Sequence, residues 1–429
     1  MAPGITENIC PENASIVDTM SITAKTKGAT AIKEKFAAFR NLVPLTSQPD
    51  VVFLNASYAP PSNLIVHEAL TTYSYEALRC PHPKPHWQAA AEELRGLVAK
   101  YVNTEPTNIA FTRDTTEGLS DFIRSVPLSA GDNVVVLDTE HPNHVYGWMA
   151  LRRLGVEVRQ VPTMAEAERT GQVVAATADT FAPWVDGRTK AIGLSSIMFH
   201  SGQRNDVAGI CAAFRPRGIH VLLDATQQVG FAALDVQSLG VSAAAFSLHK
   251  GLNCPTGLAC LYVDPAVMAE FDPVPPTVGY GAVENTRADL LVPADALVYH
   301  PTASRFDHLN ISLSAAVAGR AYLKFYLESL GPSDVEDYLY GLGDDLRKDC
   351  AELGIDIVGP ADRKGHAPHL YILKLLDPAW VELLRDRGIY VTQYRLGIRV
   401  SLGFYNNVSD IESLTRVLRE GISKGLPTM

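Results

Sequence analysis

One lysine stands among residues that could make it reactive. The segment Ala-Phe-Ser-Leu-His-Lys-Gly-Leu begins at Ala245, and a Pro-x-Gly pattern starting at Pro255 follows it. A lysine amine attacks a carbonyl only in its neutral form, which burial and nearby positive charge favour. Lys-Gly alone is typical of a solvated surface turn. The combined Ser-x-His-Lys and Pro-x-Gly pattern instead predicts a catalytic role for Lys250.

A carboxylate ends one predicted strand, and a pair of threonines at another strand end could hold a phosphate. The run His-Val-Leu-Leu-Asp reads as a strand that ends at Asp224, and Gln227 follows it. The run Phe-Thr-Arg-Asp-Thr-Thr-Glu-Gly places Thr115 and Thr116 where a strand turns into a helix. Free N–H groups and hydroxyls at such a turn can hold a phosphate. Helix caps are the ordinary alternative for both groups.

A histidine in a turn and a late arginine complete the set of candidate residues. His141 lies in Glu-His-Pro-Asn-His, where it could bind a metal, stack on a ring or make a structural hydrogen bond. We do not favour a metal, because no further ligands stand at a recognisable spacing. Arg399 lies in an apolar strand, where burial would demand an anionic partner. Its planar fork suits a substrate carboxylate, although arginines on strands are usually solvated.

The elements that must position these residues alternate between strand and helix over residues 108–263. This order predicts an α/β fold with a mostly parallel sheet that is covered on both faces. Near-continuous apolar strands such as Val134–Leu137 fit that burial. Chemistry in such sheets lies at the carboxyl ends of the strands. We expect a polar N-terminal arm over 1–28, a large domain over 29–310 and a small C-terminal α+β domain over 311–429.

Composition and charge restrict the partners of the chain. It has 429 residues, of which 47% are hydrophobic, and a net charge of −10, which argues against nucleic acid or an anionic membrane as partners. No apolar run reaches the roughly 18–20 residues that a membrane span needs. No secretory signal is visible. The six irregularly spaced cysteines are expected to be free thiols, which indicates a cytoplasmic location and no zinc site.

Taken in chain order, these motifs resemble those of the fold-type I pyridoxal 5'-phosphate (PLP) enzymes, specifically the class V aminotransferase family. The resemblance covers about residues 50–420 and includes the Thr-Thr turn, the Glu-His turn, Asp-x-x-Gln, Ser-x-His-Lys and a final Arg-x-Ser strand. It implies a large domain with a mostly parallel, mixed seven-stranded sheet and a small C-terminal domain. It also implies PLP as cofactor, a small amino-acid substrate and a homodimer.

The same resemblance implies a role for each candidate residue. Lys250 would bond to the cofactor aldehyde and later carry a proton at Cα, and Asp224 would keep the pyridine nitrogen protonated. Gln227 would bind the ring hydroxyl, and His141 would stack on the ring. The phosphate would be held by Thr115, Thr116, Ser247 and His249. The substrate carboxylate would be held by Arg399, with Asn55 nearby.

The chain also departs from the family in ways that bear on the reaction. Cysteine desulfurases carry a nucleophilic cysteine shortly before the carboxylate-binding arginine, whereas residues 390–399 hold none. We therefore expect an enzyme other than a cysteine desulfurase. The family often has Asn near the position of Phe199 or His200, so its absence predicts a changed pocket above the ring. The Arg-Phe-Glu-x-Gly-Thr segment of the family lacks its Gly-Thr at residues 305–310, which puts a phosphate contact across the dimer in question.

These departures favour the isopenicillin N epimerase-like branch, which includes enzymes of specialised (alkaloid) metabolism such as the loline-pathway type that closes a C–C bond by a Mannich reaction. The leading hypothesis is an enzyme that removes the Cα proton of an amino acid and acts as a cyclase, lyase or epimerase. An epimerase needs a second acid or base, for which His200, Tyr58 and Tyr280 are candidates by residue type only. The alternatives are a class V aminotransferase and a PLP-fold binding module that has lost catalysis.

Overall fold

The computed structural model describes residues 29–170, 172–275, 278–285, 296–308 and 310–428. Its largest sheet has seven strands in the order β2-β8-β7-β6-β5-β3-β4. All neighbours from β7 to β4 are parallel, whereas β8 runs antiparallel to both β7 and β2. The strands are β2 (Ile109–Thr112), β3 (Asn133–Leu137), β4 (Glu157–Val161), β5 (Thr189–Ser195), β6 (His220–Asp224), β7 (Ala243–Ser247) and β8 (Ala259–Val263). The predicted α/β fold with a mostly parallel, mixed seven-stranded sheet is confirmed.

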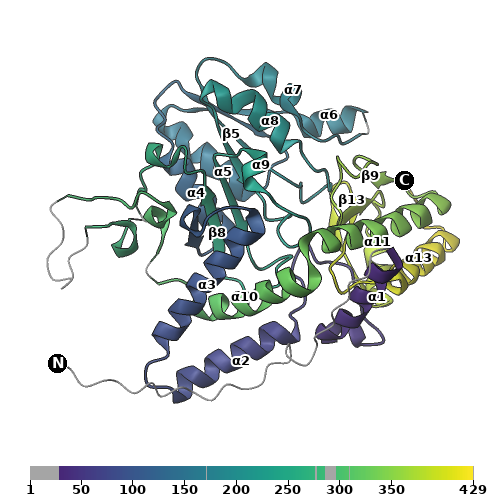
Figure 1. The fold of residues 1–429 in the computed structure, drawn as a ribbon. Helices are drawn as coiled ribbons and strands as arrows, with labels where there is room; N and C mark the ends of the chain where they lie inside the picture. Colours follow the sequence, from purple (N-terminus) through teal and green to yellow (C-terminus); the bar gives the residue numbers. More distant parts are fainter. Residues whose placement is uncertain (1–28, 171, 276–277, 286–295, 309, 429) are drawn as a thin grey trace.

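Two hydrophobic cores lie on the two faces of this sheet. Successive strand residues point to opposite faces, so Val134 and Val136 belong to one core while Val135 and Leu137 belong to the other. Helices α4 and α5 contribute to the first core, and α3, α8 and α10 contribute to the second. Figure 1 shows α4 and α5 beside the sheet. Burial on both faces explains why these strands are apolar along their whole length.

The described part of the chain also contains α-helices before, between and after these strands. They are α1 (Ala29–Phe39), α2 (Leu64–Arg79), α3 (Lys84–Val102), α4 (Thr115–Ser125), α5 (Pro142–Met149), α6 (Thr163–Thr170), α7 (Ala178–Phe181), α8 (Val207–Phe214), α9 (Val236–Leu239), α10 (Leu313–Phe325), α11 (Pro332–Glu352), α12 (Ala379–Asp386) and α13 (Val408–Ser423). Among the described residues, no helix combines the length and the apolar character that a membrane crossing requires.

A second sheet lies in the C-terminal part of the chain. It has the order β12-β13-β10-β9, is antiparallel throughout, and gathers with α11 and α13 on one side of the molecule (Figure 1). Its strands are β9 (Ile357–Val358), β10 (Leu370–Leu373), β12 (Thr392–Tyr394) and β13 (Gly397–Ser401). Strand β1 (Val52–Phe53) pairs with β11 (Ile389–Tyr390), and α1 packs on α11. The domain limits at 28 and 310 stay predictions, and the proposed arm lies outside the described residues.

The cysteines depart in one place from the expected free thiols. Cys211, Cys254, Cys260 and Cys350 are free and buried, as predicted. Cys80 is disulfide-bonded in this structure, so the prediction is wrong at that position. Irregular spacing along the chain did not reveal this bond, because a disulfide depends on which residues meet in space. The sixth cysteine, Cys10, lies outside the described residues.

Candidate active site

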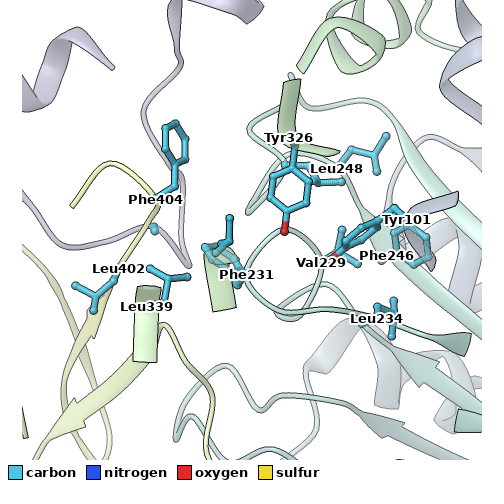
Figure 2. Close-up of a cluster of buried hydrophobic side chains, with 14 of the residues drawn as sticks. Tyr101, Val229, Phe231, Leu234, Phe246, Leu248, Tyr326, Leu339, Leu402 and Phe404 are labelled. Carbon is cyan, nitrogen blue, oxygen red and sulfur yellow. The ribbon is translucent and has the colours of Figure 1, made fainter. Parts of the chain in front are cut away.

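The turn that carries Lys250 is held against a second turn that follows Asp224. Gly230 has a φ of +82°, and a Cβ at this position would overlap the backbone of Gly251. Only glycine therefore allows the two chain segments to approach this closely. Figure 2 shows side chains from both turns, among them Val229 and Leu248, in one hydrophobic cluster. This contact between Gly230 and Gly251, where the two turns cross, fixes the lysine close to the carboxyl end of β6.

Lys250 lies where its amine is easier to deprotonate than in water. Its side chain is half-buried, and burial lowers its pKa to about 8. The positive charge of Arg399 lowers this pKa further, whereas the negative charge of Asp224 opposes the shift. The structure thus brings the predicted lysine, carboxylate and arginine within electrostatic reach of one another. A lysine in this environment can supply a neutral amine at mildly alkaline pH.

Asp224 ends strand β6 and begins a turn. Its Oδ1 accepts a hydrogen bond from the backbone N–H of Thr226 at 2.9 Å. The Gln227 side chain, in the same turn, donates to the carbonyl of Ser57 at 3.2 Å, while its Oε1 is buried without a partner among the described residues. The Asp-x-x-Gln motif therefore forms a turn and does not cap a helix. It leaves a buried acceptor next to the strand that ends in the carboxylate.

The two predicted threonines occupy the first turn of α4. The Thr115 hydroxyl is 2.8 Å from the Thr226 hydroxyl, and the Thr116 hydroxyl accepts from the side-chain amide of Asn143 at 2.8 Å. The first N–H groups of a helix lack partners within the helix and favour an anion. Asp114 caps this helix through the N–H of Glu117. The helix cap is therefore present, and the anion site at this helix start stays a prediction.

Ser247 and His249 flank this region on the lysine turn. Ser247 ends β7, and its buried hydroxyl has no hydrogen-bond partner within the described part of the chain. Burial lowers the pKa of His249 to about 4, with a contribution from Lys250. His249 is therefore neutral at pH 7 and can donate one N–H group to a ligand.

His141 is the N-cap residue of helix α5, and its Nδ1 accepts from the backbone N–H of Asn143 at 3.2 Å. Burial lowers its pKa, the charge of Lys250 lowers it further, and Asp224 opposes the shift. Behind it, the buried Glu140 carboxylate accepts from the backbone N–H of Ser195 at 2.8 Å and from its hydroxyl at 2.5 Å. Burial raises the pKa of Glu140 to about 8. Described residues give no cluster that could hold a metal ion.

Arg399 lies on β13 and is only 1% exposed. Its Nη1 donates to the carbonyl of Phe199 at 3.0 Å, while its Nε and Nη2 have no partner among the described residues. Asn55 forms a β-bridge with Ser401, which lies on the same strand as Arg399. The Asn55 Oδ1 accepts a hydrogen bond from the hydroxyl of Thr392, the residue opposite Arg399 on β12. The structure therefore places Asn55 beside the strand that carries Arg399, and its role in substrate binding stays a prediction. Two buried, unpaired guanidinium nitrogens suit a carboxylate.

These features fit PLP and an amino acid. The unpaired Ser247 hydroxyl and the α4 N-terminus suit the phosphate, and the unpaired Arg399 nitrogens suit the substrate carboxylate. The negative charge of Asp224 acts on Lys250 and His141 and would suit a cationic ring nitrogen bound near them. Buried polar groups without hydrogen bonds lower the stability of a protein. A bound ligand that forms these hydrogen bonds is therefore favoured.

The candidates for a second acid or base are less well placed. His200 is buried beside Phe199, and burial lowers its pKa to about 4. Tyr58 is 66% exposed. The side chain of Tyr280 lies outside the described residues. A role for any of them in epimerisation stays a prediction.

Two aromatic residues of the site were not among the predicted site residues. The ring of Phe199 lies 5.0 Å from His141 and 5.8 Å from Tyr394, and Tyr394 lies under the Arg399 guanidinium at 4.6 Å. The sequence indicated only that the pocket near Phe199 is changed. No pattern pointed to Tyr394, because its place depends on the pairing of β12 with β13.

Comparison with known proteins identifies the family. The model of the family described as aminotransferase class-V matches residues 65–414. The chain belongs to the class V aminotransferase family. This membership confirms the predicted family and its cofactor, PLP. The match does not test the assignment to the isopenicillin N epimerase-like branch of this family.

Relatives of this class V chain extend over most of its length. An uncharacterized protein and an uncharacterized aminotransferase, both from Schizosaccharomyces pombe, are 50% and 48% identical over 395 residues. These matches cover 92% of this chain and 89% and 98% of the relatives. A probable cysteine desulfurase from Methanothermobacter thermautotrophicus is 26% identical, covering 86% of this chain and 94% of the relative.

The apo cysteine desulfurase from Thermococcus onnurineus is similar in structure, with a TM-score of 0.77 at 22% identity. The match covers 91% of this chain and 98% of the desulfurase chain. These findings correct the expectation of a class V enzyme other than a cysteine desulfurase. That exclusion rested on the absence of a cysteine from residues 390–399. One missing side chain does not exclude a whole reaction class on a scaffold that desulfurases share over most of its length.

Proposed function

We propose that this class V enzyme removes the Cα proton of an α-amino acid and directs the remaining electron pair into a lyase, cyclase or epimerase reaction. The main support is Lys250, which lies within electrostatic reach of Asp224 and Arg399 and whose pKa burial lowers to about 8. A general base is most effective when its pKa lies near the working pH. In more detail, we propose that the enzyme belongs to the isopenicillin N epimerase-like branch and acts in specialised (alkaloid) metabolism.

Each residue has a defined task in this proposal. Arg399 and Asn55 hold the substrate carboxylate, and the Lys250 Nζ accepts the Cα proton. Asp224 keeps a ring nitrogen protonated through its negative charge. When bound, PLP supplies an electron sink for the pair left at Cα. The ring is contacted by Gln227 and His141, and the phosphate is held by Thr115, Thr116, Ser247 and His249.

A class V aminotransferase is the second candidate, supported by the name of the 48% identical relative. Transamination would require Lys250 to deliver its proton to the cofactor side instead of to Cα or a leaving group. We also propose a homodimer and a cytoplasmic location. The four free, buried cysteines support a reducing compartment, whereas the disulfide of Cys80 does not.

The test is hydrogen exchange at Cα in D₂O. The PLP-loaded protein is incubated with single L-amino acids, with L-cysteine included because desulfurases are among the relatives. Mass spectrometry follows deuterium at Cα and any products, and absorbance follows the cofactor. We expect deuterium uptake or product with at least one amino acid. The product mass then separates lyase, cyclase and aminotransferase, and chiral analysis detects an epimerase.

Two variants show whether the lysine carries the reaction. Lys250→Ala should lose exchange and turnover by several orders of magnitude while PLP still binds noncovalently. Lys324→Ala, which removes an exposed lysine on α10, should behave like the unchanged protein. Full exchange by Lys250→Ala would contradict the proposal. PLP binding without reaction of any amino acid would favour a binding module that has lost catalysis.

A further inference from the structure

We infer that the substrate carries an apolar or aromatic side chain that packs against Phe199 and Tyr394 beside Arg399. This inference deepens the proposed function and rests on it, because it assumes that the substrate carboxylate binds Arg399. Its observations are separate, since they concern the aromatic residues around that arginine.

Arg399 is fixed on two sides by these residues. The Phe199 carbonyl accepts from Nη1 at 3.0 Å, and the Tyr394 ring lies 4.6 Å from the guanidinium carbon. Tyr394 is on β12 and pairs with Gly397, one hairpin turn away from the arginine. The Nε and Nη2 atoms stay unpaired among the described residues. This edge of the guanidinium can bind both oxygens of a carboxylate.

The same two residues belong to a row of three rings. Phe199 meets His141 edge-to-face at 5.0 Å and 68°, and it meets Tyr394 at 5.8 Å and 72°. All three side chains are half-buried, so part of each remains accessible. The row runs from His141, which feels the charges of Asp224 and Lys250, to Arg399. We call these three rings the aromatic wall.

An α-amino acid that bridges the lysine and the arginine would lie beside the aromatic wall, because the wall extends from His141, near Lys250, to Tyr394, against Arg399. Its amine and its carboxylate are attached to one carbon, so a side chain on that carbon lies close to both. Aromatic faces and edges favour apolar or aromatic partners. A side chain of this kind would therefore gain contact area where it leaves the Cα atom.

The charged groups around the wall do not favour an acidic side chain. Arg395, next to Tyr394, is exposed and forms an ion pair with Glu168 of α6. His200, beyond Phe199, has its pKa lowered to about 4 by burial and is neutral at pH 7. With Lys250 attached to PLP in the loaded protein, the described residues that form or adjoin the wall thus offer a second carboxylate no unpaired cation besides Arg399.

The test uses carboxylates that cannot react, because they lack an amine. Isothermal titration calorimetry measures the binding of acetate, 3-phenylpropionate and glutarate to the PLP-loaded protein. Acetate reports on the arginine alone, and the other two add an aromatic or an acidic tail. We expect 3-phenylpropionate to bind about tenfold more tightly than acetate, and glutarate to show no such gain.

Substitutions at Tyr394 connect this preference to the wall. Tyr394→Phe keeps the ring and should retain the ratio of 3-phenylpropionate to acetate affinity. Tyr394→Ala removes the ring and should lower this ratio to near one. The ratio is the readout, because a change in the arginine itself would affect both ligands alike. If Tyr394→Ala does not fold, the three affinities of the unchanged protein decide the matter alone.

The outcomes separate the inference from the proposed function. Equal affinities for acetate and 3-phenylpropionate, a preference for glutarate, or an unchanged ratio in Tyr394→Ala would each overturn the inference alone. Absence of carboxylate binding, or equal binding by Arg399→Gln, would overturn the carboxylate site of the proposed function and the inference with it.

Discussion

Lys250 reacts with a carbonyl only as a neutral amine, so its pKa controls how fast PLP attaches. Because burial places this pKa at about 8, the rate should rise with pH up to about 8 and then level off. Below that value the neutral fraction, and hence the rate, grows about tenfold for each pH unit. Absorbance after mixing PLP with cofactor-free protein gives the rate, and borohydride reduction followed by mass spectrometry locates the attachment at Lys250.

Two neighbours should shift this pH dependence in opposite directions. Asp224 raises the pKa of Lys250, so Asp224→Asn should move the midpoint below that of the unchanged protein. Arg399 lowers the pKa, so Arg399→Gln should move the midpoint upward. Equal midpoints in all three proteins would show that neither charge acts on the lysine.

Glu140 should make stability depend on pH in the opposite sense from an ordinary carboxyl group. Its pKa is raised to about 8 by burial, so the folded protein keeps a proton that the unfolded chain loses near pH 4–5. The free energy of unfolding contributed by this group therefore falls as pH rises toward 8. The buried histidines act oppositely, but only below about pH 6.5.

Urea unfolding in the window between pH 6.5 and 8 isolates this effect only through comparison with Glu140→Gln, because Lys250, whose pKa of about 8 makes stability rise with pH, titrates in both proteins. The unchanged protein should lose stability across the window, and Glu140→Gln should lose less, since the amide keeps the shape and does not titrate. Glu382→Gln, at an exposed position on α12, should follow the unchanged protein. The same slope in Glu140→Gln and the unchanged protein would show that Glu140 does not hold the proton.

Between elements, the crossing of the two turns should be the most sensitive position. Gly230→Ala introduces a Cβ at positive φ and overlaps Gly251, so it should cost about 3 kcal/mol or more of the free energy of unfolding. Gly218→Ala is the matched control, because Gly218 has a φ of +72° with no atom within 4 Å of the added Cβ. It should cost only about 1 kcal/mol.

Urea unfolding measures both costs, and PLP attachment to Lys250 reports on the turn itself. Gly230→Ala should slow attachment, and Gly218→Ala should not. Equal stability losses in the two variants would mean that the crossing can relax without effect on the lysine.

This crossing also shows what the sequence could reveal about the site. Asp224 and Lys250 follow strands of one parallel sheet, and the strand pattern places such residues at one edge. Gly230 and Gly251 carry no sign in the sequence that they touch, because their contact depends on how two turns stack. Phe199 and Tyr394 likewise come together only through the loop after β5 and the β12–β13 register. The periodicity of the sequence predicts single strands, but it does not predict the aromatic wall, because the wall depends on contacts between distant segments.

At the scale of the whole molecule, α2 presents an apolar surface that a second copy could cover. Tyr75 and Leu78 are 54% and 75% exposed and lie three residues apart, on one face of the helix. If the proposed homodimer forms through this face, light scattering should give the mass of two 46.5 kDa chains. Replacing both residues with glutamate should reduce the mass to one chain, because the charges would be buried unpaired.

Leu376→Glu is the control for this dimer prediction, because Leu376 is 47% exposed and lies in the C-terminal part, away from α2 in the chain. It should leave the mass at two chains. A single-chain mass for the unchanged protein would contradict the homodimer. A two-chain mass for the Tyr75→Glu, Leu78→Glu variant would show that the dimer persists and that its interface does not depend on this face of α2. PLP attachment to Lys250 in the single-chain variant would then show that one copy completes the lysine site, since Lys250, Asp224 and Arg399 all come from the same chain.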